Sequence, residues 1–265
     1  MAVRLEGSRV LLTGASGGLG GTLARRLAAA GAQLVLTGRR AEVLQKLARE
    51  LDARAIPADL ADREQLERLL AAAGEVDILI ANAALPASGR LLALEAQRVD
   101  RALEVNLRAP VVLAHRLAPA MVARGSGHLV FIGSLSGKAA SGGASLYCAS
   151  KFGLRGFALA LRSELAPAGV GVSIVSPGFI SDAGMFADTA IKLPRGMSTR
   201  TSTQVAEAVV RAIVRNRGEI DVAAPAMRLG ADAANLAPAL AARVGRLIGA
   251  DALALEFEQR QADKR

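Results

Sequence analysis

The sequence predicts an α/β fold with a single doubly wound parallel sheet of about seven strands, helices on both faces and a helical C-terminal extension. Short apolar runs alternate with amphipathic segments of helical length through most of the chain. The first of these runs leads into a glycine-rich turn and a helix, and several others end in polar residues, where such sheets bind ligands. We assign residues 1–225 to one domain and residues 226–265 to the extension, which suits a chain of 265 residues.

The N-terminal segment has the layout of a phosphate-binding unit. Residues 9–13 are expected to form a buried strand, residues 14–20 a glycine-rich turn, and residues 22–30 a helix that Gly31 stops. Glycines let the backbone approach a pyrophosphate closely, and the first turn of a helix offers free N–H groups and a positive dipole. The sequence therefore predicts dinucleotide binding at this turn.

The second predicted strand, residues 33–37, bears on the choice of dinucleotide. NAD sites usually place an acidic residue near the end of this strand, but no Asp or Glu occurs from Gly7 through Ala41. Arg39 and Arg40 stand there instead, and a guanidinium matches a phosphate with two hydrogen bonds. We expect NADP(H) to be favoured over NAD(H), although one of the two arginines could simply begin a solvated helix.

The remaining elements continue the alternation of strand and helix. Further strands are expected at residues 54–59, 76–80, 127–132, 170–175 and 220–223. Helices are expected at residues 41–51, 62–73, 97–124, from Tyr147 to about Leu165, and 203–216, the last capped by Ser202 or Thr203. Pro110 and Pro119 should mark a kink or a restart within 97–124.

Polar residues mark a candidate site along this framework. Asp59, Asn82 and Ser134 each fall at the end of a predicted strand. Asn106 lies in the middle of a predicted helix, where asparagine is unfavourable, so we expect a local distortion near a site.

Tyr147 is the only tyrosine in the chain, and Lys151 follows it on the same predicted helix. Residues four apart share a helix face, so the phenol and the ammonium should point into the same pocket. A neighbouring cation favours the phenolate, so we expect a lowered pKa for Tyr147 and a proton donor tuned towards working pH. Alone, the pair also fits a partly buried tyrosine beside a surface lysine.

Taken together, these motifs resemble the short-chain dehydrogenase/reductase family, whose fold is of the Rossmann type. The resemblance covers about residues 5–225, and its motifs occur in the family's order. They are Thr13-Gly14-x-x-x-Gly18-x-Gly20, Asp59, Asn82-Ala83, Asn106, Ser134, Tyr147-x-x-x-Lys151 and Pro177-Gly178.

The resemblance implies a role for each of these residues. Tyr147 would exchange a proton with the substrate oxygen, Ser134 would hydrogen-bond that oxygen, and Lys151 would hold the nicotinamide ribose. Asn106 would support a water in the proton relay, and Asp59 would reach the adenine. The implied cofactor-binding residues are Gly14, Ser16, Gly18, Leu19, Gly20, Arg39, Asp59, Leu60, Asn82, Ala83, Lys151, Pro177, Gly178 and Ile180.

The sequence also departs from the family pattern in two places. Ala81-Asn82-Ala83-Ala84 replaces Asn-Asn-Ala-Gly, and Asp182 replaces a threonine that often contacts the nicotinamide carboxamide. Neither change removes a catalytic group, but the second puts the local cofactor geometry in doubt.

Composition excludes several other classes of protein. Net charge is +9, yet the basic residues are dispersed and aromatics make up only 3%, so we expect no nucleic-acid partner. The single cysteine, Cys148, and the absence of an apolar N-terminal region suggest a cytoplasmic protein. No apolar run is long enough to span a membrane, and no residue cluster has metal-ligand spacing. We expect a homodimer or homotetramer.

Two segments have several interpretations. Residues 179–200 lie where the family places its substrate lid, with Phe179, Met185, Phe186, Ile191 and Leu193 as pocket residues and Gly184 and Gly196 as hinges, although a mobile surface loop is an equal alternative. In residues 226–265, an apolar stripe could pack on its own subunit or a partner, cover the active site, or contact a membrane surface.

The function that these residues favour is hydride transfer between NADP(H) and a moderately apolar ketone or secondary alcohol. A 3-oxoacyl thioester reductase is the alternative within the enzyme class, because scattered arginines could meet an acidic carrier. Outside that class, the chain could be an NADP(H)-binding sensor that has lost turnover.

Overall fold

The computed structural model describes residues 3–187, 198–239 and 243. It confirms the predicted fold: seven strands form one sheet in the order β3-β2-β1-β4-β5-β6-β7, and every neighbouring pair is parallel. The strands are β1 (Arg9–Thr13), β2 (Gln33–Gly38), β3 (Arg54–Pro57), β4 (Ile78–Ala81), β5 (Gly127–Ile132), β6 (Val170–Pro177) and β7 (Glu219–Val222).

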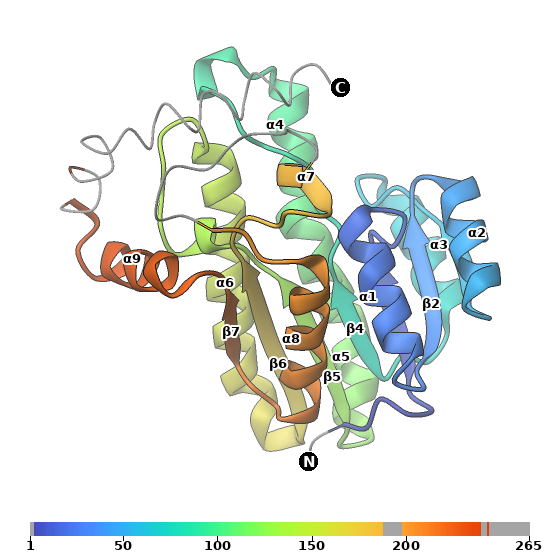
Figure 1. The fold of residues 1–265 in the computed structure, drawn as a ribbon. Coiled ribbons are helices and arrows are strands. Elements are labelled where there is room, and N and C mark those ends of the chain that lie inside the picture. The colour runs from blue at the N-terminus through green and yellow to red at the C-terminus, as the bar shows by residue number, and fades with distance from the viewer. Residues whose placement is uncertain (1–2, 188–197, 240–242, 244–265) are drawn as a thin grey trace.

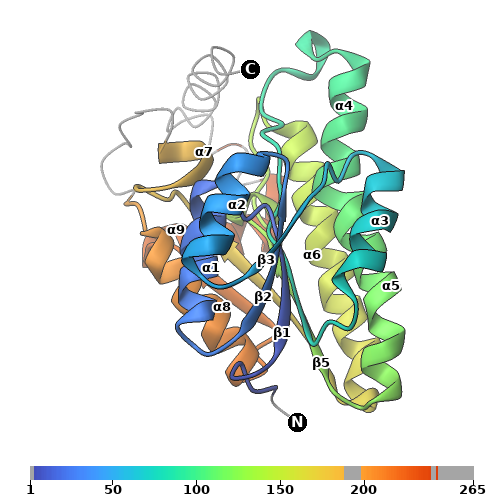
Figure 2. The same ribbon diagram turned by 90° about the vertical axis from the view of Figure 1, so that its right-hand side faces the viewer.

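Helices cover both faces of the sheet (Figure 1). Viewed along the sheet, α1, α2 and α8 lie on one side, and α3, α5 and α6 lie on the other (Figure 2). The helices are α1 (Gly18–Ala28), α2 (Ala41–Glu50), α3 (Arg63–Ala73), α4 (Ala96–Leu103), α5 (Ala109–Ala123), α6 (Ser145–Leu165), α7 (Gly184–Ala187), α8 (Ser202–Val214) and α9 (Pro225–Leu236).

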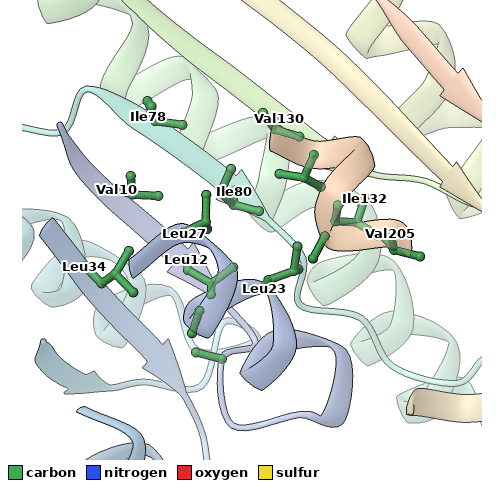
Figure 3. Close-up of a cluster of buried hydrophobic side chains, with 14 of the residues drawn as sticks. Val10, Leu12, Leu23, Leu27, Leu34, Ile78, Ile80, Val130, Ile132 and Val205 are labelled. Atoms are coloured by element: carbon green, nitrogen blue, oxygen red, sulfur yellow. The ribbon is translucent and has the colours of Figure 1, made fainter. Parts of the chain in front are cut away.

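Side-chain alternation along the strands supplies both hydrophobic layers. Val10 and Leu12 of β1 pack against α1, whereas Leu11 between them belongs to the cluster on the opposite face. Figure 3 shows the first cluster, where Leu23 and Leu27 of α1 lie against the strands. Burial of one such aliphatic side chain stabilises the fold by roughly 1.5–3 kcal/mol. The carboxyl ends of the strands are therefore held in a rigid row.

The helix predicted at residues 97–124 is interrupted, as expected. A π-helical turn, Glu104–Arg108, separates α4 from α5 and contains the buried Asn106. Pro110 stands at the start of α5, directly after the π-helical bond from the Ala109 N–H to the Glu104 oxygen, where the hydrogen-bond spacing of the helix changes. Pro119 lies inside α5 without ending it, so only the first proline marks a restart.

The helix after the lid region begins at a different cap from those predicted. Thr201, and not Ser202 or Thr203, is the N-cap of α8. Its side chain accepts from the Gln204 N–H, while the Gln204 side chain accepts from the Thr201 N–H, at 3.2 and 3.0 Å. A capping box needs glutamine or glutamate three residues after the N-cap. Gln204 occupies that position only when Thr201 is the N-cap.

Parts of the two ambiguous segments lie outside the described residues. These include Ile191, Leu193 and Gly196 of the predicted lid, and most of the predicted stripe beyond Leu236. Among the residues that the structure describes, no helix combines the length and apolarity that crossing a bilayer requires.

Candidate active site

A cleft of about 1790 Å³ opens at the carboxyl ends of the strands. Every residue predicted to bind the cofactor lines it, and so do Ser134 and Tyr147. Pockets for drug-sized ligands usually measure roughly 300–1000 Å³, so this cleft has room for a large ligand beside a smaller one. The predicted site residues are thus brought together, with Asn106 the exception.

The turn between β1 and α1 needs glycine at two positions for steric reasons. Gly14 has φ +67°, and a Cβ there would lie 2.8 Å from the Cα of Ala83. A Cβ on Gly20 would lie 2.1 Å from the main-chain oxygen of Gly14. The N-cap of α1, Gly17, provides no side-chain acceptor, so the first N–H groups of the helix are open to an anion.

Thr13 joins this turn to the end of β4. Its Oγ1 accepts hydrogen bonds from the N–H groups of Asn82 and Ala83, both at 3.0 Å. The Asn82 side chain donates back to the main-chain oxygens of Thr13 and Gly14, at 3.0 and 3.3 Å. The Ala-Asn-Ala-Ala variant of the family motif therefore still ties β4 to the glycine turn.

The far end of the cleft is basic. The guanidinium of Arg40 donates to the main-chain oxygen of Ser16, whereas Arg39 is exposed and has no ion pair within the described part of the chain. Asp59 is held by Arg101 at 2.5 Å and by the Ala61 N–H at 3.0 Å. Burial works to raise the pKa of Asp59, but these hydrogen bonds outweigh it and leave the pKa below its usual value.

Ser134 and Tyr147 meet at the other end of the cleft. Ser134 lies two residues after the end of β5 and caps a short 3-10 turn, Leu135–Gly137, by accepting from the Ser136 N–H at 3.1 Å. A hydrogen bond between Ser134 and Tyr147 acts to lower the pKa of the phenol, but burial dominates and raises that pKa to about 12. The predicted lowering is wrong for this arrangement, and the hydroxyl is protonated at neutral pH.

The surroundings of Lys151 explain why its charge does not lower the pKa of Tyr147. Its Nζ lies 5.7 Å from the centre of the Tyr147 ring and donates to the main-chain oxygen of Ile132 at 2.9 Å. The side chain is buried, and desolvation lowers the pKa of Lys151 to about 8. The two residues share a helix face as predicted, but burial is the main cause of the pKa shift of each.

Asn106 contacts the cleft only indirectly, by holding the main chain of Leu85. Its Oδ1 accepts from the N–H of Leu85 at 2.7 Å, and its Nδ2 donates to the oxygen of the same residue at 2.9 Å. Leu85 lines the cleft, whereas Asn106 does not. The π-helical turn thus places the Asn106 amide against the segment that follows β4. The water predicted at Asn106 stays a prediction.

Asp182 lines the cleft, and its carboxylate is occupied by bonds to the start of α8. Both of its carboxylate oxygens accept from Ser202, one from the N–H at 2.7 Å and one from the hydroxyl at 3.0 Å. Phe179 and Phe186 contact each other with ring centres 4.7 Å apart, and both line the cleft. The described part of the predicted lid is therefore anchored at the start of α8 and presents aromatic surface to the cleft.

Sequence reasoning missed an ion cluster beside the site. Lys138, four residues after Ser134, is buried and pairs with Asp221 at 2.7 Å, Asp232 at 3.4 Å and Glu219 at 3.5 Å. Arg155 of α6 pairs with the same Glu219 at 2.7 Å. The only signal in the sequence was the rarity of lysine, because the carboxylates come from β7 and α9 and cannot be paired by spacing.

The described residues contain no cluster of His, Cys, Asp and Glu that could hold a metal ion. Of the two histidines, His115 is exposed, and His128 is buried with its Nε2 2.8 Å from the Ser173 hydroxyl. Burial lowers the pKa of His128 to about 4, so this ring is neutral and supports the sheet.

The chain belongs to the short chain dehydrogenase family, whose sequence pattern it matches over residues 8–193. It is 34% identical to a protein of Nostoc sp. named ketoacyl reductase HetN, over 98% of this chain and 94% of the relative.

Two solved structures share the fold. A short-chain dehydrogenase from Sphingobium yanoikuyae in complex with NADPH has a TM-score of 0.75 and 30% identity, covering 81% of this chain and 87% of that one. An alcohol dehydrogenase from Comamonas testosteroni described as specific for bulky-bulky ketones has a TM-score of 0.74 and 28% identity, covering 86% and 92%. The protein is thus an oxidoreductase of this family.

Proposed function

We propose that this protein is an NADP(H)-dependent enzyme that interconverts a ketone and a secondary alcohol, with Ser134, Tyr147 and Lys151 as its catalytic residues. The observation that carries the proposal is that Ser134, just beyond β5, and Tyr147 of α6 line the same dinucleotide-sized cleft, with the amine of Lys151 5.7 Å from the centre of the phenol ring. Relatives named as a ketoacyl reductase and a ketone-specific alcohol dehydrogenase support the same chemistry.

The residues fit the pyrophosphate and the 2′-phosphate of the cofactor. The glycine turn leaves no room for side chains and offers the uncapped start of α1 to a pyrophosphate, with Gly14, Gly18 and Gly20 as its floor. Arg39 acts on Asp59 by charge but forms no salt bridge in the described ranges, and it stands where a 2′-phosphate would be recognised. The similar structure that holds NADPH supports this choice of cofactor.

The reduction uses the phenol as an acid. When bound, the dinucleotide supplies the hydride that the carbonyl carbon accepts. As negative charge develops on the carbonyl oxygen, the hydroxyls of Ser134 and Tyr147 donate hydrogen bonds to it. Tyr147 then transfers its proton to that oxygen, giving the alcohol, and regains a proton from solvent. The raised pKa of Tyr147 keeps the phenol protonated for this step.

A 3-oxoacyl thioester reductase is the second candidate. It would use the same residues on the keto group of a carrier-bound chain, and the relative named as a ketoacyl reductase favours it. The two candidates differ in what lies beside the carbonyl, an alkyl or aryl group in one case and a thioester arm in the other.

The test is steady-state oxidation of NADPH with free ketones and with 3-oxoacyl thioesters, using wild type and Tyr147→Phe. We expect turnover in the wild type and a loss of about 100-fold or more in the variant, the range for removal of a general acid. The better substrate class decides between the two candidates. Binding of NADPH without turnover of any carbonyl would refute both and favour a sensor.

A further inference from the structure

We propose that helix α9 forms a wall of the substrate pocket, and that the gap it leaves at Gly230 receives one substituent of the carbonyl substrate. Gly230 is then a specificity-determining position, with Met227 beside it as the adjustable side chain. This inference rests on the proposed function and deepens it by saying how large a substrate the pocket accepts on this side.

The position of α9 is the first observation. The helix lies beside the carboxyl end of β7, at the opposite edge of the sheet from β3 (Figure 1). Met227, Gly230 and Ala234, one helical turn apart, line the same cleft as Ser134 and Tyr147. Phe179 and Met185 line it from a different segment, near α7. A carbonyl held at Tyr147 therefore has wall residues from two separate segments around it.

Packing fixes the inner end of α9 against the catalytic turn. Met227 and Ala231 form a cluster with Leu135, the residue that follows Ser134. A Cβ built on Gly178 would lie 3.4 Å from the Met227 methyl group and 3.5 Å from Leu135, so both side chains border Gly178. Met227 thus lies between the serine turn and the end of β6, within reach of a substituent on the carbonyl.

The ion cluster fixes the same helix by charge. Asp232 of α9 pairs at 3.4 Å with Lys138, which is buried on the segment that follows Ser134. Lys138 is held at the same time by Asp221 of β7 at 2.7 Å. A wall that is tied to the catalytic turn by both packing and charge can set the size of a substrate, because it cannot easily move aside.

The gap itself is at Gly230. A Cβ there would have no atom within 4 Å, so the glycine is not required by packing. Glycine is also the poorest former of helix interiors apart from proline. The residue leaves open volume in the cleft where most side chains would be tolerated by the fold, and that volume is available to a substrate.

The experiment compares kcat/KM for acetone, acetophenone and benzophenone with NADPH in wild type, Gly230→Leu and Met227→Ala. A matching pair of short and long 3-oxoacyl thioesters replaces the ketones if thioesters are the better substrates. We expect Gly230→Leu to lower the ratio of kcat/KM for the bulky ketone to kcat/KM for the small one by about tenfold or more. A single methylene in a pocket already changes such a ratio by about tenfold. Met227→Ala should raise this ratio, because the shorter side chain leaves more room for a bulky substituent.

Gly156→Leu is the matched control. Gly156 lies in the interior of α6, also has no atom within 4 Å of a built Cβ, and does not line the cleft. It should leave the ratio and the affinity for NADPH unchanged. An unchanged ratio in both Gly230→Leu and Met227→Ala, with wild type active, would overturn this inference alone. A wild type that reduces no carbonyl would overturn the proposed function, and the inference with it.

Discussion

Lys151 donates a hydrogen bond from its ammonium to the main-chain oxygen of Ile132, at 2.9 Å. The bond joins the helix that carries Tyr147 to the last residue of the strand that precedes Ser134. It holds the amine beneath the phenol, 5.7 Å from the ring centre, in a site with almost no access to solvent. The charged state of Lys151 is therefore costly, and its titration should be visible both in activity and in stability.

The first prediction concerns the pH dependence of carbonyl reduction. Burial lowers the pKa of Lys151 to about 8, so the amine loses its charge above that pH. A charged amine hydrogen-bonds the ribose of the cofactor more strongly than a neutral one, so kcat/KM for NADPH at saturating carbonyl should fall as pH rises through about 8. Stopped-flow or steady-state rates across this range measure the decline.

The variant Lys151→Arg separates this cause from a general loss of structure. Arginine stays protonated throughout the accessible range, so the decline should move to higher pH even if the maximal rate is lower. A decline at the same pH in wild type and Lys151→Arg would show that another group titrates.

The second prediction concerns stability and the same amine. In the unfolded chain the pKa of Lys151 returns to its ordinary value of 10.5, above its folded value of about 8. Between these two pH values the unfolded state binds more protons, so the free energy of unfolding should rise with pH. Below the folded pKa both states carry the charge, and the fold bears the full cost of burying it.

Urea unfolding of wild type and Lys151→Met across that window measures the effect. The stability difference between wild type and variant should shift in favour of wild type as pH rises from about 8 towards about 10. A difference that stays constant over the window would contradict the lowered pKa. Tyr147 does not interfere, because burial raises its pKa to about 12 and its linkage lies at higher pH.

Much of the fold followed from local patterns in the sequence. The alternation of Val10, Leu11 and Leu12 between two faces, and the glycine turn after them, were predictable from a few neighbouring residues, although the close approach of Ala83 to Gly14 was not. The restart at Pro110 was predictable for the same reason. The N-cap of α8 was harder to predict, because Thr201, Ser202 and Thr203 can all cap a helix. Only the bond from the Thr201 N–H to the Gln204 side chain distinguishes the first of them.

The candidate site was predictable in its residues but not in its energetics. The i, i+4 spacing placed Tyr147 and Lys151 on one face, as the cleft confirms. It could not reveal that Ile132 would take the amine's hydrogen bond or that burial would outweigh charge. Burial and partner choice depend on contacts between distant segments, and the Lys138–Asp232 pair is the clearest case.

The third prediction concerns Asn106. Replacement by alanine removes the acceptor for the Leu85 N–H and the donor for the Leu85 oxygen. Leaving these partly buried groups unpaired should lower the free energy of unfolding by about 1–3 kcal/mol. Urea unfolding measures the change, with Asn235→Ala on the exposed side of α9 as the control. A loss no greater than that of the control would mean that solvent satisfies Leu85.

The last prediction concerns the choice between NADPH and NADH. Arg39 lines the cleft and has no ion pair within the described residues, so its guanidinium is free to bind a 2′-phosphate. A charged hydrogen bond contributes about 1.5–3 kcal/mol, so Arg39→Ala should weaken NADPH binding by about 10- to 100-fold and leave NADH binding nearly unchanged. Arg49→Ala on α2 removes the same charge from outside the cleft and should affect neither. Calorimetry or fluorescence titration gives the four dissociation constants, and equal wild-type affinities for the two cofactors would refute the role given to Arg39.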